Sequence, residues 1–200
     1  MEVVITDTRD EAGKLAADAI GELVQRRPEA VLGVATGSSP LIIYDELGRR
    51  VAQGSLSLAS ARAFMLDEYV GLPADHPQRY RNVIQADFVD KVDIDPARVL
   101  GPDGLAENLA TACDAYEHAI DDAGGVDLQI LGIGTDGHVA FNEPGSSVAL
   151  GPTAWDDPLL WEMLPRDQVQ QQLGEEIRRM TPDAIERARQ LGARALELVN

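Results

Sequence analysis

Three short segments of the chain hold residues whose types and spacing suit acid–base chemistry or anion binding. The densest lies between Gly132 and Gly145, where Asp136, His138 and Glu143 stand within eight residues of one another. Neighbouring carboxylates control the charge and tautomer of a histidine, as an acid–base catalyst requires. Two other interpretations stay open. One is a purely structural role, and the other is a metal site, although zinc favours more histidine and cysteine than this chain's three histidines and one cysteine supply.

A second segment holds two adjacent acids, Asp67 and Glu68, directly after an apolar run. Burying a carboxylate is costly unless it is paired or used. At the carboxyl end of a strand, Asp67 could abstract a proton from a bound substrate. The competing interpretation is that these acids cap a helix or form a salt bridge with Arg79 or Arg81.

The third segment consists of Thr36, Gly37, Ser38 and Ser39, between a predicted strand and a predicted helix. A short turn that opens a helix presents unpaired backbone N–H groups and the positive end of the helix dipole. Serine and threonine hydroxyls add further donors, so the segment suits a phosphate group. The alternative is an ordinary capped turn, which needs the same residue types.

Alternating strand-like and helix-like patterns predict the elements that position these segments. Apolar runs predict strands at residues 2–6, 30–35, 61–66 and 127–133, and periodic patterns predict helices at about 8–27, 40–53 and 105–123. Thr8 and Glu11 have the spacing of a capping box. Strands that alternate with helices imply a parallel, Rossmann-like α/β sheet in a three-layer domain. Ligands of such sheets bind beyond the carboxyl ends of the strands, so we expect the three segments to share one cleft.

Composition narrows the classes of partner. The chain has 200 residues, 44% of them hydrophobic, and a net charge of −17, which makes nucleic acid a poor partner. An anionic substrate would therefore need local N–H groups or arginines. The apolar runs are shorter than the ~20 residues of a membrane span, and we see no secretory signal. Cys113 is the only cysteine, so no internal disulfide can form, and a cytoplasmic protein is expected.

The last quarter of the chain differs from the rest. Residues 148–165 are irregular and rich in proline, helical patterns follow at about 166–179 and 182–199, and no strand-like run follows Ile133. We expect a single domain over residues 1–200 with a divergent, mostly helical segment at 148–200 that lacks some strands. An incomplete sheet edge would favour association into a homo-oligomer.

Taken together, the three segments resemble the glucosamine-6-phosphate deaminase (glucosamine/galactosamine-6-phosphate isomerase) family. The resemblance rests on residues 33–41, 66–78 and 131–147, and covers roughly residues 1–147. The related 6-phosphogluconolactonases share the fold and a Gly-x-Asp-Gly-His turn. They usually lack the Phe-Asn-Glu-Pro-Gly and Asp-Glu-Tyr-Val-Gly-Leu stretches, both of which occur here.

The resemblance implies a role for each candidate. Asp67 would move the proton between C2 and C1 of the open-chain sugar, and His138 would open the pyranose ring. Asp136 and Glu143 would orient that histidine, and residues 36–39 would hold the 6-phosphate. It also implies an amino-sugar phosphate as substrate and no metal or organic cofactor. The alternatives are an impaired relative that only binds sugar phosphates, and a hydrolase that resembles the lactonases.

The chain departs from the family in its positive charges. Family members use an arginine and a late lysine around the phosphate, whereas no lysine or arginine occurs here between Arg98 and Arg166. We therefore expect a high KM for the substrate or no measurable activity, unless Arg166, Arg178 or an arginine of a neighbouring subunit folds over the pocket.

Overall fold

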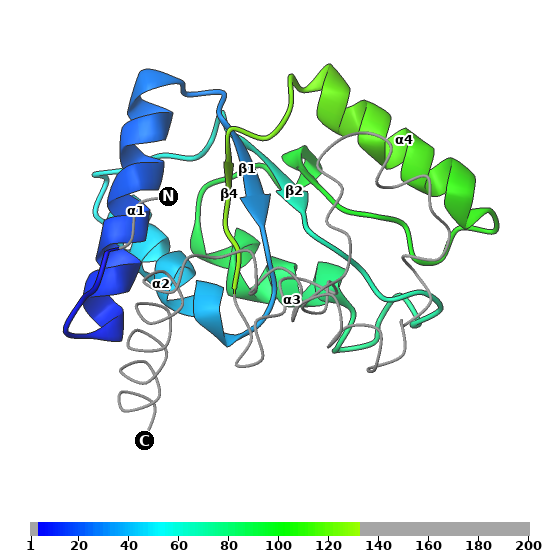
Figure 1. Ribbon diagram of the computed structural model, residues 1–200, viewed down its shortest axis with the longest axis horizontal. Coiled ribbons are helices and arrows are strands. Elements are labelled where there is room, and N and C mark those ends of the chain that lie inside the picture. Colours follow the sequence, from blue (N-terminus) through cyan, green and yellow to red (C-terminus); the bar gives the residue numbers. More distant parts are fainter. Residues whose placement is uncertain (1–3, 133–200) are drawn as a thin grey trace, which may run out of the picture. The chain divides into compact units, whose positions relative to one another are not determined.

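The computed structural model of the protein describes residues 4–132, in which four strands form one sheet (Figure 1). The strands are β1 (Val31–Val34), β2 (Arg62–Met65), β3 (Val99–Leu100) and β4 (Leu128–Gln129). All neighbouring strands are parallel, in the order β3-β2-β1-β4. This parallel sheet confirms the predicted α/β fold class, and it places the carboxyl ends of β1, β2 and β4 at one edge.

Helices cover both faces of the sheet. They are α1 (Arg9–Arg26), α2 (Ser38–Ala52), α3 (Tyr80–Asp87) and α4 (Leu109–Asp122), with 3₁₀ turns at Val89–Lys91 and Pro96–Arg98. On one face, Leu32 and Val34 of β1 belong to a core cluster that contains buried residues of α1 and α2. On the other face, the ring of Phe64 in β2 lies 5.8 Å from that of Tyr116 in α4. The described helices and strands belong to one compact unit, residues 1–134.

Helices α1 and α2 pack closely because glycines of α1 face α2. A Cβ atom at Gly13 would lie 2.8 Å from Cγ1 of Ile42, so a larger residue would force the helices apart. Two turns further along α1, a Cβ atom at Gly21 would lie 3.8 Å from Nη1 of Arg50. Both pairs are 29 residues apart in the chain, so the two helices run side by side in one register.

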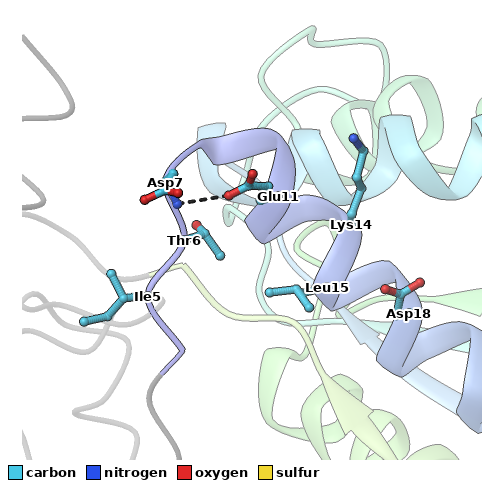
Figure 2. A pocket seen from close by; sticks show the side chains of 7 residues that line it. All are labelled: Ile5, Thr6, Asp7, Glu11, Lys14, Leu15 and Asp18. Atoms are coloured by element: carbon cyan, nitrogen blue, oxygen red, sulfur yellow. Dashed lines mark hydrogen bonds between the residues drawn. The ribbon is translucent and has the colours of Figure 1, made fainter.

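The predicted helix start at Thr8 is confirmed. The Thr8 hydroxyl accepts a hydrogen bond from the backbone N–H of Glu11 at 3.2 Å. The Glu11 carboxylate accepts in turn from the N–H of Asp7 at 3.0 Å, one residue before the position usual in a capping box (Figure 2).

The predicted strand at residues 2–6 is wrong for residues 4–6, which are irregular. Val4 and Ile5 are 63% and 60% exposed, and the Thr6 hydroxyl donates to the carbonyl of Thr8 at 2.9 Å. Local hydrogen bonds of this kind compete with the sheet ladder for the backbone. Residues 4–6 lead into the capped start of α1 and pair with no strand of the described sheet.

Other predicted boundaries hold to different degrees. The strands at 30–35 and 61–66 and the helices at 8–27 and 40–53 are confirmed to within two residues. The strand at 127–133 shortens to β4, and the helix at 105–123 begins only at Leu109, because the Asn108 side chain caps it.

Within the described residues, no helix is long and apolar enough to cross a membrane. The predicted helical segment at 148–200 lies outside them.

Candidate active site

The chain turns sharply between β1 and α2, and this turn holds the predicted phosphate segment. Gly37 precedes α2 with φ of +99°, a conformation that glycine adopts at little cost. No side chain from residues 4–132 caps the first turn of α2, and that turn contains no acidic residue. Ser38 and Ser39 are exposed. Residues 36–39 therefore present uncapped N–H groups and hydroxyls to solvent, as an anion site requires.

Tyr44 of α2 secures the end of β1 just before this turn. Its hydroxyl donates to the carbonyl of Ala35 at 2.8 Å and accepts from the N–H of the same residue at 3.0 Å. Tyr44 is fully buried, and its ring lies 5.0 Å from that of Phe88. Burial raises the pKa of Tyr44 well above its ordinary value, so the phenol stays neutral. The backbone that enters the turn is thus fixed from within the helix that follows it.

Asp67 lies two residues beyond the end of β2 and is half-buried. It forms no hydrogen bond or ion pair with the other described residues. Burial raises the pKa of Asp67 to about 6, and the negative charge of Glu68 adds to the effect. A general base works best when its pKa is near the working pH, so Asp67 has the environment of a base.

Glu68, the neighbouring acid, has a structural position instead. Its buried carboxylate accepts from the N–H groups of Tyr69 at 2.8 Å, Tyr80 at 2.8 Å and Arg81 at 2.9 Å. The last two belong to the first turn of α3, so Glu68 caps that helix from a distance. Nε of Arg79 lies 3.6 Å from the same carboxylate and makes no hydrogen bond within the described structure. The capping interpretation therefore holds for Glu68 and not for Asp67.

Tyr80 connects the turn after β1 with the turn after β2. Burial raises its pKa, Tyr69 and Asp67 raise it further, and a hydrogen bond with Thr36 lowers it. The phenol therefore contacts Thr36 and lies within the range of the Asp67 charge. Tyr116 approaches from α4, and its hydroxyl donates to the carbonyl of Met65 at the end of β2.

The start of the third segment also reaches this edge of the sheet. A Cβ atom at Gly132 would lie 3.4 Å from both Cβ and Oγ of Ser39. The first residue of the Gly132–Gly145 segment thus lies beside the phosphate segment, and all three segments begin at the carboxyl ends of neighbouring strands, as predicted.

The rest of that segment lies outside the described residues, including Asp136, His138 and Glu143. Their roles therefore stay predictions. Among the residues that are described, no cluster of histidine, cysteine and acidic side chains could hold a metal ion.

A surface hollow of about 390 Å³ lies elsewhere, along the first turns of α1 (Figure 2). It is lined by residues between Ile5 and Asp18, and none of the candidate site residues contributes to it. Three of its side chains are acidic, so it is poorly suited to an anion.

Three tyrosines of the site, Tyr44, Tyr80 and Tyr116, were not predicted from the sequence, and the two acids were not separated. Tyr44 looks like a core residue in the apolar stripe of α2, and Tyr116 looks the same in α4. Only the fold shows that their hydroxyls reach the strand ends. No pattern distinguishes Glu68 from Asp67, because the N–H groups that Glu68 accepts are 12 and 13 residues further along the chain.

Comparisons with known proteins agree with this arrangement. Glucosamine-6-phosphate deaminases of Beutenbergia cavernae and Mycolicibacterium smegmatis are 66% and 65% identical to this chain over 149 residues. Each alignment covers 74% of this chain and 57% of the relative, so the chain spans little more than half the length of these curated relatives.

Solved structures give the same result. A monomeric glucosamine-6-phosphate deaminase has a TM-score of 0.70 at 38% identity, over 74% of this chain and 61% of the other. A 6-phosphogluconolactonase from Thermotoga maritima has a TM-score of 0.59 at 25% identity, over 70% of this chain and 62% of the other.

A family profile matches the chain over residues 6–153, which is well over half of its length. The profile is that of the glucosamine-6-phosphate isomerases/6-phosphogluconolactonase, and it spans all the described elements from α1 to β4. The protein therefore belongs to the family of glucosamine-6-phosphate isomerases and 6-phosphogluconolactonases.

Proposed function

We propose that this protein is a glucosamine-6-phosphate deaminase, which converts glucosamine 6-phosphate and water into fructose 6-phosphate and ammonia. The observation that carries the proposal is Asp67, a half-buried acid with a pKa of about 6 and no partner among the described residues. The Tyr80 phenol, on which the charge of Asp67 acts, hydrogen-bonds with Thr36 at the start of an uncapped helix turn suited to phosphate.

The chemistry needs one base and one acid, placed beside a fixed sugar. In the open-chain form, the Asp67 carboxylate takes the proton from C2, and the electrons of the C–H bond form a C1–C2 double bond. The pair of the C1 carbonyl moves to O1, which takes a proton given up by the C2 ammonium group, and the product is an enolamine. Returning the proton to C1 gives an imine at C2, and water replaces the imine nitrogen to release ammonia. In this proposal His138 opens the sugar ring, and Asp136 and Glu143 orient it. No metal or organic cofactor takes part.

The phosphate is held by residues 36–39, at the positive end of α2. Holding the distal phosphate places C1 and C2 next to Asp67, which makes the proton transfer effectively unimolecular.

We also propose that the enzyme is cytoplasmic, which is consistent with its single cysteine, Cys113. We further propose that it associates into a homo-oligomer through an open edge of the sheet.

A coupled assay for ammonia released from glucosamine 6-phosphate tests the proposal, with Asp67→Asn as the control. Ammonia released by the unmodified chain and not by the variant would support it. Hydrolysis of 6-phosphogluconolactone without ammonia release would identify a lactonase instead. Binding of glucosamine 6-phosphate with neither reaction would identify a relative that only binds sugar phosphates.

A further inference from the structure

Arg9, the first residue of α1, reaches the phosphate segment from the neighbouring helix. Its Nη2 donates a hydrogen bond to the backbone carbonyl of Ser38 at 3.4 Å. Both residues are exposed to solvent. The guanidinium has several more N–H donors than this one contact uses, and none of them bonds to another of the described residues.

The packing of α1 on α2 fixes this proximity. Arg9 and Ser38 are 29 residues apart, the same spacing as the close pair of Gly13 and Ile42. Residues four apart on a helix lie on one face, so Arg9 stands one turn before Gly13, as Ser38 stands one turn before Ile42. The position of Arg9 beside the turn is therefore set by the helix backbones and does not depend on its side-chain rotamer alone.

The charge of Arg9 is not neutralised by a carboxylate within the described structure. Among the described cations, Arg27, Arg49, Arg50, Arg79 and Lys91 pair with acidic side chains, whereas Arg9 does not, and neither do Lys14, Arg26, Arg62, Arg81 and Arg98. An unpaired guanidinium can bind two oxygens of a phosphate at once, which is the geometry that its planar fork favours.

Helix stability gives no reason for an arginine at this position. The N-terminus of a helix is the positive end of its dipole and favours acids, such as Asp10 and Glu11 of the same turn. Those acids also oppose an anion nearby, as does the net charge of −17. The helix dipole therefore disfavours a cation at position 9, and the nearby acids disfavour a bound anion. Arg9 nevertheless contacts the phosphate segment, which indicates a binding role.

We propose that the Arg9 guanidinium binds the phosphate group of the substrate at residues 36–39. The inference rests on the proposed function and adds a positive charge at the phosphate, from the start of the chain and not from the later part, where no lysine or arginine occurs between Arg98 and Arg166. The N–H groups of the α2 turn bind the phosphate from one side, and Arg9 binds it from the side of α1.

The test uses the full chain, with Arg9→Ala and a charge-matched control, Arg26→Ala, in the last turn of the same helix. Arg26 is exposed and lies about 25 Å from Arg9, at 1.5 Å per helical residue. Calorimetry measures the binding of inorganic phosphate and of glucosamine 6-phosphate, and kinetics give kcat and KM. Thermal melting shows whether each variant stays folded.

We expect Arg9→Ala to weaken the binding of both ligands about fivefold, which corresponds to ~1 kcal/mol. KM should rise by the same factor while kcat changes little, because the arginine holds a distal group. The melting temperature should not fall, because the removed charge opposed the helix dipole. Arg26→Ala should bind like the unmodified chain, and Arg9→Lys should recover only part of the loss.

Equal phosphate affinity in Arg9→Ala and Arg26→Ala would overturn the inference, as would an unmodified chain that does not bind phosphate. Phosphate binding that depends on Arg9 in a chain that releases no ammonia would refute the proposed deaminase and leave the role of Arg9 intact.

Discussion

Asp67 and Glu68 are adjacent in the chain, yet their carboxylates have opposite surroundings. Glu68 accepts three backbone N–H groups within 2.9 Å, whereas Asp67 accepts none from the described residues. One acid therefore holds the loop that begins after β2, and the other is left free for a ligand. The following predictions depend on this division.

Asp67→Asn should lower turnover by ~10² or more while the fold stays intact, because general-base catalysis contributes at least that much. Steady-state release of ammonia measures the loss, and circular dichroism checks the fold. Near-normal turnover in this variant would remove Asp67 from the mechanism.

The same variant should be more stable than the unmodified chain at neutral pH. Asp67 has a folded pKa of about 6 against an ordinary value of 3.8, so its ionised form is disfavoured in the fold. Protonated Asp67 therefore stabilises the native state relative to the unfolded chain. This stabilisation is fully present below pH ~4 and is lost as the pH rises through 6. Two pKa units correspond to at most ~3 kcal/mol, and partial solvation of Asp67 should reduce this to ~1–2 kcal/mol.

Denaturant unfolding of both proteins at pH 4 and pH 8 measures this difference. We expect similar stabilities at pH 4 and a more stable variant at pH 8. A difference that does not change with pH would show that the ionisation of Asp67 has no effect on folding.

Glu68→Gln should reduce both stability and turnover. The amide nitrogen would replace one acceptor oxygen and face a backbone N–H donor, so a buried group would lose its hydrogen bond at a cost of ~1–3 kcal/mol. The start of α3 and the loop after Asp67 would then shift, and we expect kcat to fall about tenfold, since misplaced catalytic groups commonly cost that much or more.

Glu46→Gln is the matched control for this change. Glu46 is also a buried acid, and its Oε1 pairs with Arg49 at 2.6 Å and Arg50 at 2.8 Å, but it lies in the middle of α2. The Glu46→Gln variant should be less stable than the unmodified chain and should keep its kcat. Equal losses of kcat in both variants would mean that general destabilisation, and not the loop, explains the effect of Glu68→Gln.

Tyr44→Phe should loosen the entry to the phosphate segment without unfolding the core. The ring still packs against Phe88, but the N–H and carbonyl of Ala35 lose their partner. We expect a loss of ~1–2 kcal/mol in stability. Amide hydrogen exchange in residues 33–41 should become about tenfold faster.

Phe88→Leu provides the comparison for this prediction. It weakens the same aromatic pair from the other side and leaves the hydrogen bonds of Ala35 in place. If both variants speed amide exchange at residues 33–41 equally, the hydrogen bonds of the Tyr44 hydroxyl do not specifically stabilise the turn.

The parts of the fold that the sequence predicted well are those with strong local signals. β1 is a buried apolar run, β2 is apolar after Arg62, and α1 is capped by a threonine with a glutamate three residues later. The turn at residues 36–39 and Asp67 follow directly from these strands, so their shared edge was predictable from the alternation of elements.

The remaining features depend on contacts between distant segments. β3 has only two residues and α3 has eight, too few to give a clear period. The strand predicted at residues 2–6 is wrong for residues 4–6, where the Thr6 hydroxyl bonds to the Thr8 carbonyl and the chain leads into the capped start of α1. Arg9 escaped notice because nothing in its own surroundings shows that α2 begins beside it.

The register between α1 and α2 makes the site sensitive to chain length as well as to residue type. A residue inserted between Arg9 and Gly13 would turn the arginine by about 100° around the helix axis and move it 1.5 Å along it. The helix would persist and the turn at residues 36–39 would be unchanged, but the guanidinium would point away from Ser38. An insertion or deletion in this first turn would therefore alter phosphate affinity without changing any residue of the turn or the catalytic base.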